Sequence, residues 1–304
     1  MQNTQELKDE IRALAKAKNA VILAHFYTLP EIQEIADFVG DSYQLARLAV
    51  DDSRQVVVFC GVSFMGESAC ILNPAKTVLL PCFDAVCPMA EMVSAGQIAA
   101  ARAKYDDLAV VCYINSTAKI KALCDVCVTS SNALKIVRNL PNKNIFFVPD
   151  EHLGSFIKAS VKEKNIILAE GFCEVHAAIT ADAVGNAKKS HPNAKVIAHP
   201  ECKKEVVALS DFVGSTKGLI DFAKNDEASE FIVCTERGIE HALRIAAPRK
   251  AFYFPLENQI CENMKKITLE SVRDCLLKFE PVEVAPNLAT AALAPLAKML
   301  ELSK

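Results

Sequence analysis

The sequence lacks three features that would place it in familiar classes. No uncharged apolar run reaches the roughly 20 residues needed to cross a bilayer, so we expect no membrane association. Residues 1–18 are charged and helical in pattern, which is not typical of a signal peptide. Positive charge is not in excess either, because the net charge is -3 and the isoelectric point is near 6.1, and this argues against nucleic acid as a partner. We therefore expect a cytoplasmic protein that acts on small molecules.

Apolar residues and cysteines are what the chain has in quantity. Hydrophobic residues make up 51% of the 304 residues, with a mean hydropathy of +0.19, which is enough for more than one packed core. The 12 cysteines exceed what packing requires, and a chain of this size needs no disulfides to hold it together. In a reducing compartment, the cysteines point instead to metal or redox chemistry.

A repeat recurs along the chain at intervals of 86 to 88 residues, and four landmarks define it. Apolar strands at 20–27, 108–115 and 194–201 end in polar residues, and Tyr27, Tyr113 and His199 are spaced 86 and 86 apart. Three further landmarks recur at intervals of 86 to 88 residues. They are a hydroxyl residue that opens a helical stretch, a second apolar strand, and a strand that leads to a cysteine. The hydroxyl residues are Ser42, Ser130 and Thr216; the further strands are 56–61, 144–149 and 230–235; the cysteines are Cys87, Cys173 and Cys261.

Strands rich in Val, Ile and Leu that alternate with helical segments predict parallel sheet covered on both faces. We expect an α/β fold of three pseudo-repeated three-layer α/β/α domains with parallel sheets around a pseudo-threefold axis. The predicted domains are residues 16–100, 101–186 and 187–276, with N- and C-terminal helices packed on them. Since ligands bind beyond the carboxyl ends of such strands, one site would form where the three repeats meet. An ancient duplication without a shared site is the alternative.

The repeat register selects three cysteines that should meet, Cys87, Cys173 and Cys261. Three thiolates from distant parts of the chain suit an iron-sulfur cluster whose remaining iron is open, or less naturally a zinc site. An open iron is a Lewis acid that can bind a hydroxyl, carboxylate or amine group.

The other cysteines are off this register. Cys124 and Cys127 have the spacing of redox pairs and zinc sites, but no second pair accompanies them, so we interpret them as buried structural thiols. Cys82 and Cys202 have no counterparts in the other repeats and stay unassigned. Small hydrophobic roles are expected for Cys60, Cys70, Cys112, Cys234 and Cys275.

Polar residues at the strand ends and helix starts would line a cavity beside the cysteines. A single hydroxyl at a helix start is usually an ordinary N-cap, but three in one register favour a binding site for anionic groups. Glu201 is the natural general base. The other proton carriers and hydrogen-bond donors are His25, Tyr27, Tyr113, Asn115, His176 and His199.

These residues also carry a family resemblance over nearly the whole chain. The segments AHFYTLPEIQEIADFVGDS, CGVSFMGESACIL, DAVCPMAEM, YINSTAKIKALCDVCVTSSNA, GFCEVH, AHPEC and VGSTKG resemble the quinolinate synthases. The resemblance implies condensation of iminoaspartate with dihydroxyacetone phosphate to quinolinate in de novo NAD biosynthesis, with release of phosphate and two waters. It implies a [4Fe-4S] cluster with one open iron as Lewis acid, and a functional link to L-aspartate oxidase, which makes iminoaspartate.

The resemblance also implies roles for individual residues. The cluster ligands would be Cys87, Cys173 and Cys261. The catalytic residues would be His25, Tyr27, His176, His199 and Glu201. The substrate-binding residues would be His25, Asp41, Ser42, Tyr113, Asn115, Ser130, His199, Glu201, Ser215 and Thr216.

Two functions from other classes would use the same cysteines. An electron carrier or iron-sulfur sensor predicts a cluster without a cavity of acid-base residues, and a zinc hydrolase predicts zinc without the brown absorbance of a cluster.

Overall fold

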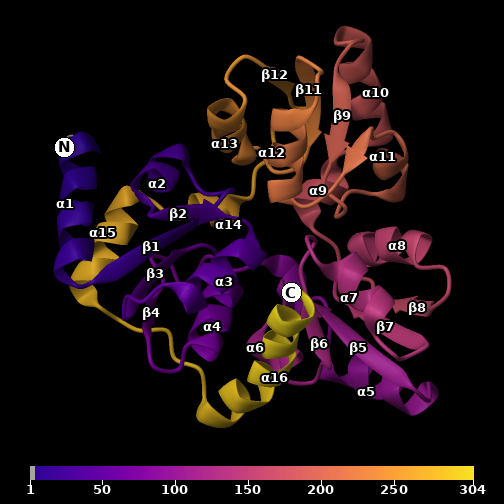
Figure 1. Ribbon diagram of the computed structural model, residues 1–304, viewed down its shortest axis with the longest axis horizontal. Helices are drawn as coiled ribbons and strands as arrows, with labels where there is room; N and C mark the ends of the chain where they lie inside the picture. Colours follow the sequence, from indigo (N-terminus) through magenta and orange to yellow (C-terminus); the bar gives the residue numbers. More distant parts are fainter. Residues whose placement is uncertain (1–3) are drawn as a thin grey trace.

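A computed structural model describes residues 4–304, which form three lobes around a common centre (Figure 1). Repeat 1 contains β1 (Ala20–His25), α2 (Pro30–Ile35), β2 (Phe38–Gly40), α3 (Ser42–Asp51), β3 (Val56–Cys60), α4 (Ser63–Leu72), β4 (Thr77–Leu79) and the 3-10 helix η1 (Pro88–Glu91). Repeat 2 contains α5 (Ala95–Lys104), β5 (Leu108–Tyr113), α6 (Ala118–Lys121), β6 (Val126–Val128), α7 (Ala133–Asn139), β7 (Asn144–Val148), α8 (Glu151–Ser160), β8 (Asn165–Leu168) and α9 (Glu174–Ala178).

The third lobe and the ends of the chain complete the structure. Repeat 3 contains α10 (Ala181–Ser190), β9 (Lys195–Ala198), α11 (Lys204–Ala208), β10 (Phe212–Val213), α12 (Thr216–Asn225), β11 (Glu230–Cys234), α13 (Ile239–Ala246), β12 (Ala251–Tyr253) and α14 (Glu262–Lys265). The remaining helices are α1 (Thr4–Ala17), α15 (Leu269–Lys278) and α16 (Pro286–Leu302).

The three sheets share one topology, which confirms the predicted α/β fold of three repeated parallel units. Their strand orders are β2-β1-β3-β4, β6-β5-β7-β8 and β10-β9-β11-β12, and every pairing is parallel. Every residue of β1 and β3 is buried, because helices cover both faces of the sheet. The carboxyl ends of all three sheets point to the centre of the molecule.

The strand register corrects the alignment of the polar strand ends. Equivalent pairs in the three sheets are separated by 88 residues from repeat 1 to repeat 2 and by 86 from repeat 2 to repeat 3. The predicted alignment, which placed Tyr27 86 residues before Tyr113, is therefore wrong by two residues between repeats 1 and 2. His25, Tyr113 and His199 occupy one equivalent position, and Tyr27, Asn115 and Glu201 occupy the position two residues later.

One helix start also differs from the prediction. Ser42 and Thr216 are the first residues of α3 and α12, as expected, but α7 begins at Ala133, after Ser130. The Asn132 side chain accepts a hydrogen bond of 2.7 Å from the backbone N-H of Thr129, which closes a turn ahead of the helix. Ser130 therefore lies in this turn.

The hydrophobic cores join repeats 1 and 2 more closely than either joins repeat 3. One large cluster of buried residues spans repeats 1 and 2 and includes Leu296 and Met299 of α16, which packs on α4, α6 and β6. Repeat 3 has its own cores, and Phe26 of repeat 1 is the buried residue that reaches into one of them. The expected packing of terminal helices is visible in α1, which lies against α15 beside β1.

Helix α15 packs on repeat 1, although most of it falls within the third predicted domain. Its buried residues Leu269, Val272 and Leu276 share a core with β1 and β3. The predicted domain limits remain a prediction. Among residues 4–304, no helix combines the length and the apolar character that crossing a bilayer requires.

Candidate active site

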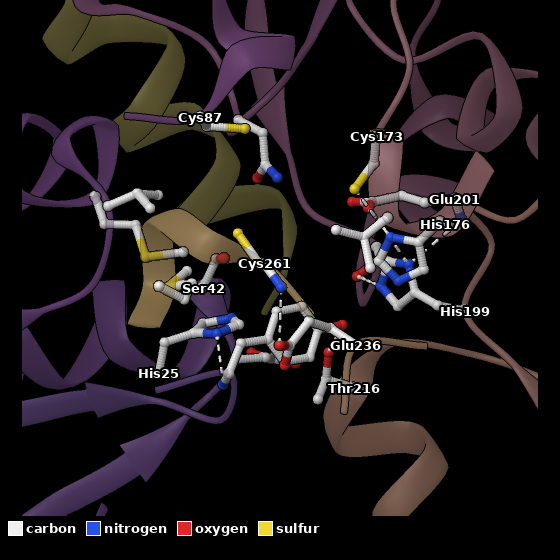
Figure 2. Close-up of a pocket in the computed structure, with 18 of the residues that line it drawn as sticks. His25, Ser42, Cys87, Cys173, His176, His199, Glu201, Thr216, Glu236 and Cys261 are labelled. Carbon is white, nitrogen blue, oxygen red and sulfur yellow. Dashed lines mark hydrogen bonds and ion pairs between the residues drawn. The ribbon is translucent and has the colours of Figure 1, made fainter. Parts of the chain in front are cut away.

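A single pocket lies at the centre, where the carboxyl ends of the three sheets converge (Figure 2). Its cavity volume, counted as the space open to the centre of a water-sized sphere, is about 70 Å³. Its polar and sulfur-bearing walls come from all three repeats. They include His25, Tyr27, Asp41, Ser42, Cys87, Tyr113, Asn115, Thr129, Ser130, Cys173, His176, His199, Glu201, Thr216, Glu236 and Cys261.

Cys87, Cys173 and Cys261 reach the pocket through the same local structure. Each is the N-cap residue of a short helix, η1, α9 or α14. The backbone carbonyl two residues before each cysteine accepts a hydrogen bond from the segment that follows β3, β7 or β11. These hydrogen bonds run from Ser63 N-H to Ala85 O (2.8 Å), from Glu151 N-H to Gly171 O (2.7 Å) and from Arg237 N-H to Gln259 O (2.7 Å). The three cysteines therefore converge because one backbone arrangement is repeated three times.

The three thiols are suited to bind a positively charged centre. Burial raises the pKa of Cys87 to about 12, with Glu201 and Cys261 adding to the shift. Burial also raises the pKa of Cys173 and of Cys261. Such thiols lose their protons readily only when a cation replaces them, and metal binding supplies that charge. Three sulfur donors directed at one pocket are an appropriate ligand set for a metal cofactor.

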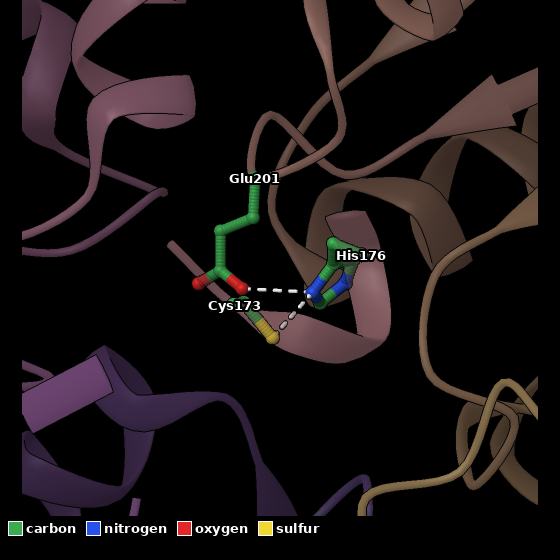
Figure 3. A group of neighbouring side chains, drawn as sticks. All are labelled: Cys173, His176 and Glu201. Atoms are coloured by element: carbon green, nitrogen blue, oxygen red, sulfur yellow. Dashed lines mark hydrogen bonds and ion pairs between the residues drawn. The ribbon is translucent and has the colours of Figure 1, made fainter. Parts of the chain in front are cut away.

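Cys173 has a second set of neighbours that could bind a metal ion. Its Sγ, a ring nitrogen of His176 and a carboxylate oxygen of Glu201 all lie within 4.8 Å of one another (Figure 3). His176 Nδ1 is 3.1 Å from the sulfur and 2.8 Å from Glu201 Oε2. The acid-base residues of the pocket are thus in direct contact with one of the three cysteines.

Glu201 is held as a carboxylate although it is buried. Burial opposes its ionisation, but the nearby His176 and His199 rings together with hydrogen bonds from His176 and Tyr113 hold the pKa of Glu201 well below its usual range. Tyr113 donates a hydrogen bond of 2.5 Å to Oε1, and His176 Nδ1 is near Oε2. Both carboxylate oxygens therefore have a partner that favours the charged form.

A chain of hydrogen bonds connects Glu201 to Tyr27 and includes residues of all three repeats. If His176 Nδ1 donates to Glu201, then Nε2 accepts from the Thr235 hydroxyl at 2.9 Å. Thr235 Oγ1 in turn is 2.8 Å from Tyr27 Oη, which is also 3.0 Å from Thr216 Oγ1. Burial and Glu201 raise the pKa of Tyr27 well above its usual value, so the phenol keeps its proton.

His25 and His199 are neutral and share one tautomer. In each, Nδ1 accepts the backbone N-H two residues later, from Tyr27 at 3.1 Å and from Glu201 at 3.3 Å. Burial is the largest cause that lowers the pKa of both histidines to about 3. Each ring therefore carries its hydrogen on Nε2, which in His199 lies 3.1 Å from Ser130 Oγ.

Two buried polar atoms of the pocket have no hydrogen-bond partner within residues 4–304. They are Asn115 Oδ1 and Thr129 Oγ1, both in repeat 2. Buried polar groups are almost always paired, so unpaired ones on a pocket wall indicate a polar ligand. Together with Ser42, Ser130 and Thr216, they surround the pocket with hydroxyl and amide groups from all three repeats.

Comparison with known proteins agrees with this geometry. The family model described as "Quinolinate synthetase A protein" matches residues 9–301. The quinolinate synthase of Caldicellulosiruptor saccharolyticus is 52% identical over 301 residues, which covers 98% of this chain and 99% of the relative. The quinolinate synthase of Fusobacterium nucleatum is 52% identical over 298 residues, which covers 98% of this chain and 99% of the relative.

The chain belongs to the quinolinate synthase family. It is therefore an enzyme of NAD biosynthesis, and the predicted family is confirmed.

Nearly all site residues that the sequence predicted lie on this one pocket. Ser215 is not among the pocket residues, because its hydroxyl is the N-cap of α12 and accepts the backbone N-H of Gly218 at 3.2 Å. Asp41 borders the pocket, but its carboxylate caps α3 through Gln44 N-H and accepts from Ser131 Oγ at 2.8 Å. This carboxylate orients the start of α3, and its role in binding substrate stays a prediction.

Sequence reasoning missed three polar residues of the site, Thr129, Thr235 and Glu236. Thr129 and Thr235 directly precede Ser130 and Glu236 in the chain. Glu236 stands 86 residues after Asp150, a buried carboxyl group at the same place in repeat 2. The repeat steps, if continued two residues beyond the third strand of each sheet, could have found this pair of acids.

The remaining cysteines lie mostly in the interior. Cys124 and Cys127 are buried, as the sequence predicted. They lie near Cys112 and beside Lys121, whose fully buried Nζ donates to Ser68 Oγ at 2.9 Å and Ser116 O at 2.6 Å. Cys60, Cys234 and Cys275 are also buried, Cys70 is half-buried, Cys202 is buried and Cys82 is half-buried.

Proposed function

We propose that this quinolinate synthase condenses iminoaspartate with dihydroxyacetone phosphate to form quinolinate, phosphate and two waters. In this proposal a [4Fe-4S] cluster on Cys87, Cys173 and Cys261 leaves one iron open to the substrate. The enzyme would consume the product of an L-aspartate oxidase. The proposal rests chiefly on one observation, which is that three half-buried thiols and a buried network of acid-base residues line the same pocket.

The cysteines are a suitable set for such a cluster. All three thiols line the central pocket. Each is followed by a short helix whose backbone N-H groups lower the thiol pKa, which opposes the effect of burial. N-H groups directed at cluster sulfurs are a common means of tuning iron-sulfur sites. When bound, the cluster would supply a Lewis-acidic iron that polarises an oxygen or nitrogen of the substrate.

Hydroxyl and amide groups of the pocket would hold the anionic groups of the substrates. Ser42 and Thr216 begin helices of 10 residues each, whose free N-H groups and dipoles favour negative charge. Asn115 Oδ1 and Thr129 Oγ1 are buried without a partner among residues 4–304; the Thr129 hydroxyl can donate to a phosphate or carboxylate, whereas Asn115 Oδ1 can accept from a hydroxyl or amine of the substrate. Fixing both substrates in this way places the reacting atoms close together, which can lower the barrier by several kcal/mol, up to about 10.

Glu201 would remove the protons that isomerisation, imine formation and loss of water require. Its carboxylate is ionised and can take a proton from the substrate, while the hydrogen bond from His176 Nδ1 holds the carboxylate in place. Tyr27 would keep its proton and, through Thr235 and His176, fix the direction of the hydrogen bonds toward Glu201, since its hydroxyl lies 2.8 Å from that of Thr235. His25 and His199 would donate hydrogen bonds from Nε2 to developing negative charge.

Burial of these groups would protect reactive intermediates from water. His25, His199, Glu201 and Thr216 are each no more than 4% exposed. Iminoaspartate hydrolyses in water, so a site closed to solvent would raise the fraction that reacts with the second substrate.

The test is iron and sulfide analysis of anaerobically purified protein, with quinolinate formation from iminoaspartate and dihydroxyacetone phosphate, for wild type and Cys173→Ser. We expect about four irons per chain and activity in the wild type, with loss of both in the variant. Zinc in place of iron would favour a site at Cys173, His176 and Glu201 and would refute the cluster. Intact iron without quinolinate would refute the reaction.

A further inference from the structure

Helix α14 carries both a proposed cluster ligand and a lysine that binds the catalytic loop of another repeat. Cys261 is the N-cap of α14, and Lys265 is its last residue. Lys265 Nζ donates to the backbone carbonyl of Tyr27 in repeat 1 at 2.5 Å and pairs with Glu236 Oε1 in repeat 3 at 2.8 Å. Lys265, whose ammonium group fixes Tyr27, is therefore only four positions after the cysteine that would bind iron.

Glu236 links the same two features from the other side. Its side chain is 1% exposed, and Oε1 accepts the backbone N-H of Cys261 at 3.0 Å in addition to Lys265. Oε2 accepts the backbone N-H of Gly238 at 2.6 Å. One buried carboxylate thus holds the backbone of the ligand, the lysine and the loop that faces repeat 1.

Gly238 shows how closely repeat 3 approaches repeat 1 at this point. A Cβ on Gly238 would lie 2.7 Å from Tyr27 Cα and 2.8 Å from Lys265 Nζ, closer than any side chain allows. Its carbonyl accepts from Gln33 Nε2 at 3.2 Å, and the same amide nitrogen reaches the carbonyls of Phe26 and Thr28, each at 3.0 Å. The turn that carries Tyr27 is therefore held directly against Gly238.

Only repeat 3 has this link among the residues that the structure describes. The equivalent position is Val62 in repeat 1, which has no charge. In repeat 2 it is Asp150, whose Oδ1 accepts two N-H groups of its own helix, from His152 and Leu153. The repeated fold does not require the contacts among Glu236, Gly238 and Lys265, so these contacts indicate a role that is particular to the junction of repeats 1 and 3.

We propose that Glu236, Gly238 and Lys265 form a latch that places Tyr27 according to whether Cys261 is bound to the cluster. Ligation would fix the N-terminus of α14, and this would direct Lys265 to the Tyr27 carbonyl and to Glu236. Tyr27 would then keep its hydroxyl contacts with Thr216 and Thr235. Glu236 and Lys265 are positioning residues in this view, and the inference rests on the proposed cluster at Cys261.

The first experiment compares hydrogen-deuterium exchange in wild-type protein with and without its cluster, under anaerobic conditions. The amides of Phe26, Tyr27 and Thr28 are hydrogen-bonded to Gly40 O, His25 Nδ1 and His25 O, so a peptide over 25–29 reports the turn. Removal of the cluster should raise exchange of this peptide by about 10-fold or more, as expected for local opening. Equal exchange in both forms would overturn the latch. This readout needs no assay for quinolinate, so it fails or succeeds apart from the proposed reaction.

The second experiment removes the ammonium group with Lys265→Met and uses Lys224→Met, on an exposed residue of α12, as the control. We expect Lys265→Met to keep its iron, to lose about 10- to 100-fold in kcat because Tyr27 is displaced, and to change KM by less than about 3-fold. Exchange over 25–29 should rise in the iron-loaded variant to the level of the cluster-free wild type. Wild-type kcat together with wild-type exchange in Lys265→Met would refute the latch, whereas loss of iron in that variant would show that Lys265 only supports the ligand.

Discussion

Thr235 is a residue whose importance depends on two distant partners. Its hydroxyl lies 2.9 Å from His176 Nε2 and 2.8 Å from Tyr27 Oη, and its side chain is completely buried. With His176 Nδ1 directed at Glu201, the Thr235 hydrogen points to the imidazole and its lone pair accepts from Tyr27. A hydroxyl at this position thereby fixes the direction of three hydrogen bonds.

Replacing Thr235 with valine should remove this connection while keeping the shape of the side chain. We expect Thr235→Val to lower kcat by about 100-fold, with normal iron content, because His176 loses the hydroxyl that fixes the tautomer facing the general base Glu201. Thr235→Ser keeps the hydroxyl and should retain activity within about 5-fold, since only a methyl group is lost. Steady-state kinetics of the two variants measures the difference. Similar losses in both would show that packing, and not the hydroxyl, matters at position 235.

His25 and His199 make the stability of the cluster-free protein depend on pH. Their pKa values are near 3 in the folded chain and near 6.5 in the unfolded chain, so the unfolded state binds more protons between these limits. The free energy of unfolding therefore falls as the pH drops below about 6.5. From pH 7.5 to pH 5.5 each histidine should contribute a loss of about 1.4 kcal/mol.

Urea unfolding of the cluster-free protein at pH 7.5 and 5.5 measures this loss. His199→Gln removes one titrating ring, so the difference between the two pH values should shrink by about 1.4 kcal/mol relative to wild type. His241→Gln is the control, because this ring belongs to α13 outside the central pocket. An unchanged difference in His199→Gln would mean that this histidine is not held in its neutral form.

Individual residues also show how far the sequence could predict the site. The repeat register identified the three cysteines and the polar strand ends because these depend on strand position alone. It could not identify Thr235 or Lys265, since their roles come from contacts between repeats that are about 200 residues apart in sequence. The hydroxyl of Ser215 caps its own helix, a local contact that spacing does not reveal, and its predicted role in binding substrate stays a prediction.

At the scale of elements, a backbone N-H group just after β3, β7 or β11 anchors the segment that leads to a cysteine in the same repeat. In repeat 2 this group belongs to Glu151, the first residue of α8, and it donates to Gly171 O at 2.7 Å. Proline is well tolerated at the first position of a helix, where the N-H is not needed by the helix itself. Asp150 has φ -80° and ψ 110°, which suits a residue before proline.

Glu151→Pro should therefore delete the anchor of the Cys173 segment and leave α8 intact. We expect iron to be lost on chelator challenge about 5- to 10-fold faster than in wild type, since one hydrogen bond contributes about 1 kcal/mol. Glu151→Ala keeps the N-H and should match wild type. The measurement is the decay of cluster absorbance, with circular dichroism to verify helix content. Equal decay in both variants would assign the rigidity of this segment to other contacts.

At the scale of the whole molecule, the three repeats are similar in fold but not in how they are joined. Helix α16 closes a core that repeats 1 and 2 share, so these two units form one body. Repeat 3 has separate cores and meets repeat 1 mainly through Phe26 and through polar contacts around Tyr27, which include Thr216, Thr235 and Lys265. Interfaces of this polar kind open more easily than a continuous core.

Two leucine variants can separate these units. Leu296 of α16 and Leu243 of α13 are both fully buried, the first in the core of repeats 1 and 2 and the second in a core of repeat 3. Each change to alanine should lower the free energy of unfolding by about 2 to 5 kcal/mol. Leu243→Ala should raise hydrogen exchange in β9 and β11 alone, whereas Leu296→Ala should raise it in β1, β3, β5 and β7 together. If either variant raised exchange equally in all three sheets, the chain would unfold as a single unit, and repeat 3 could not move on repeats 1 and 2 without disrupting their core.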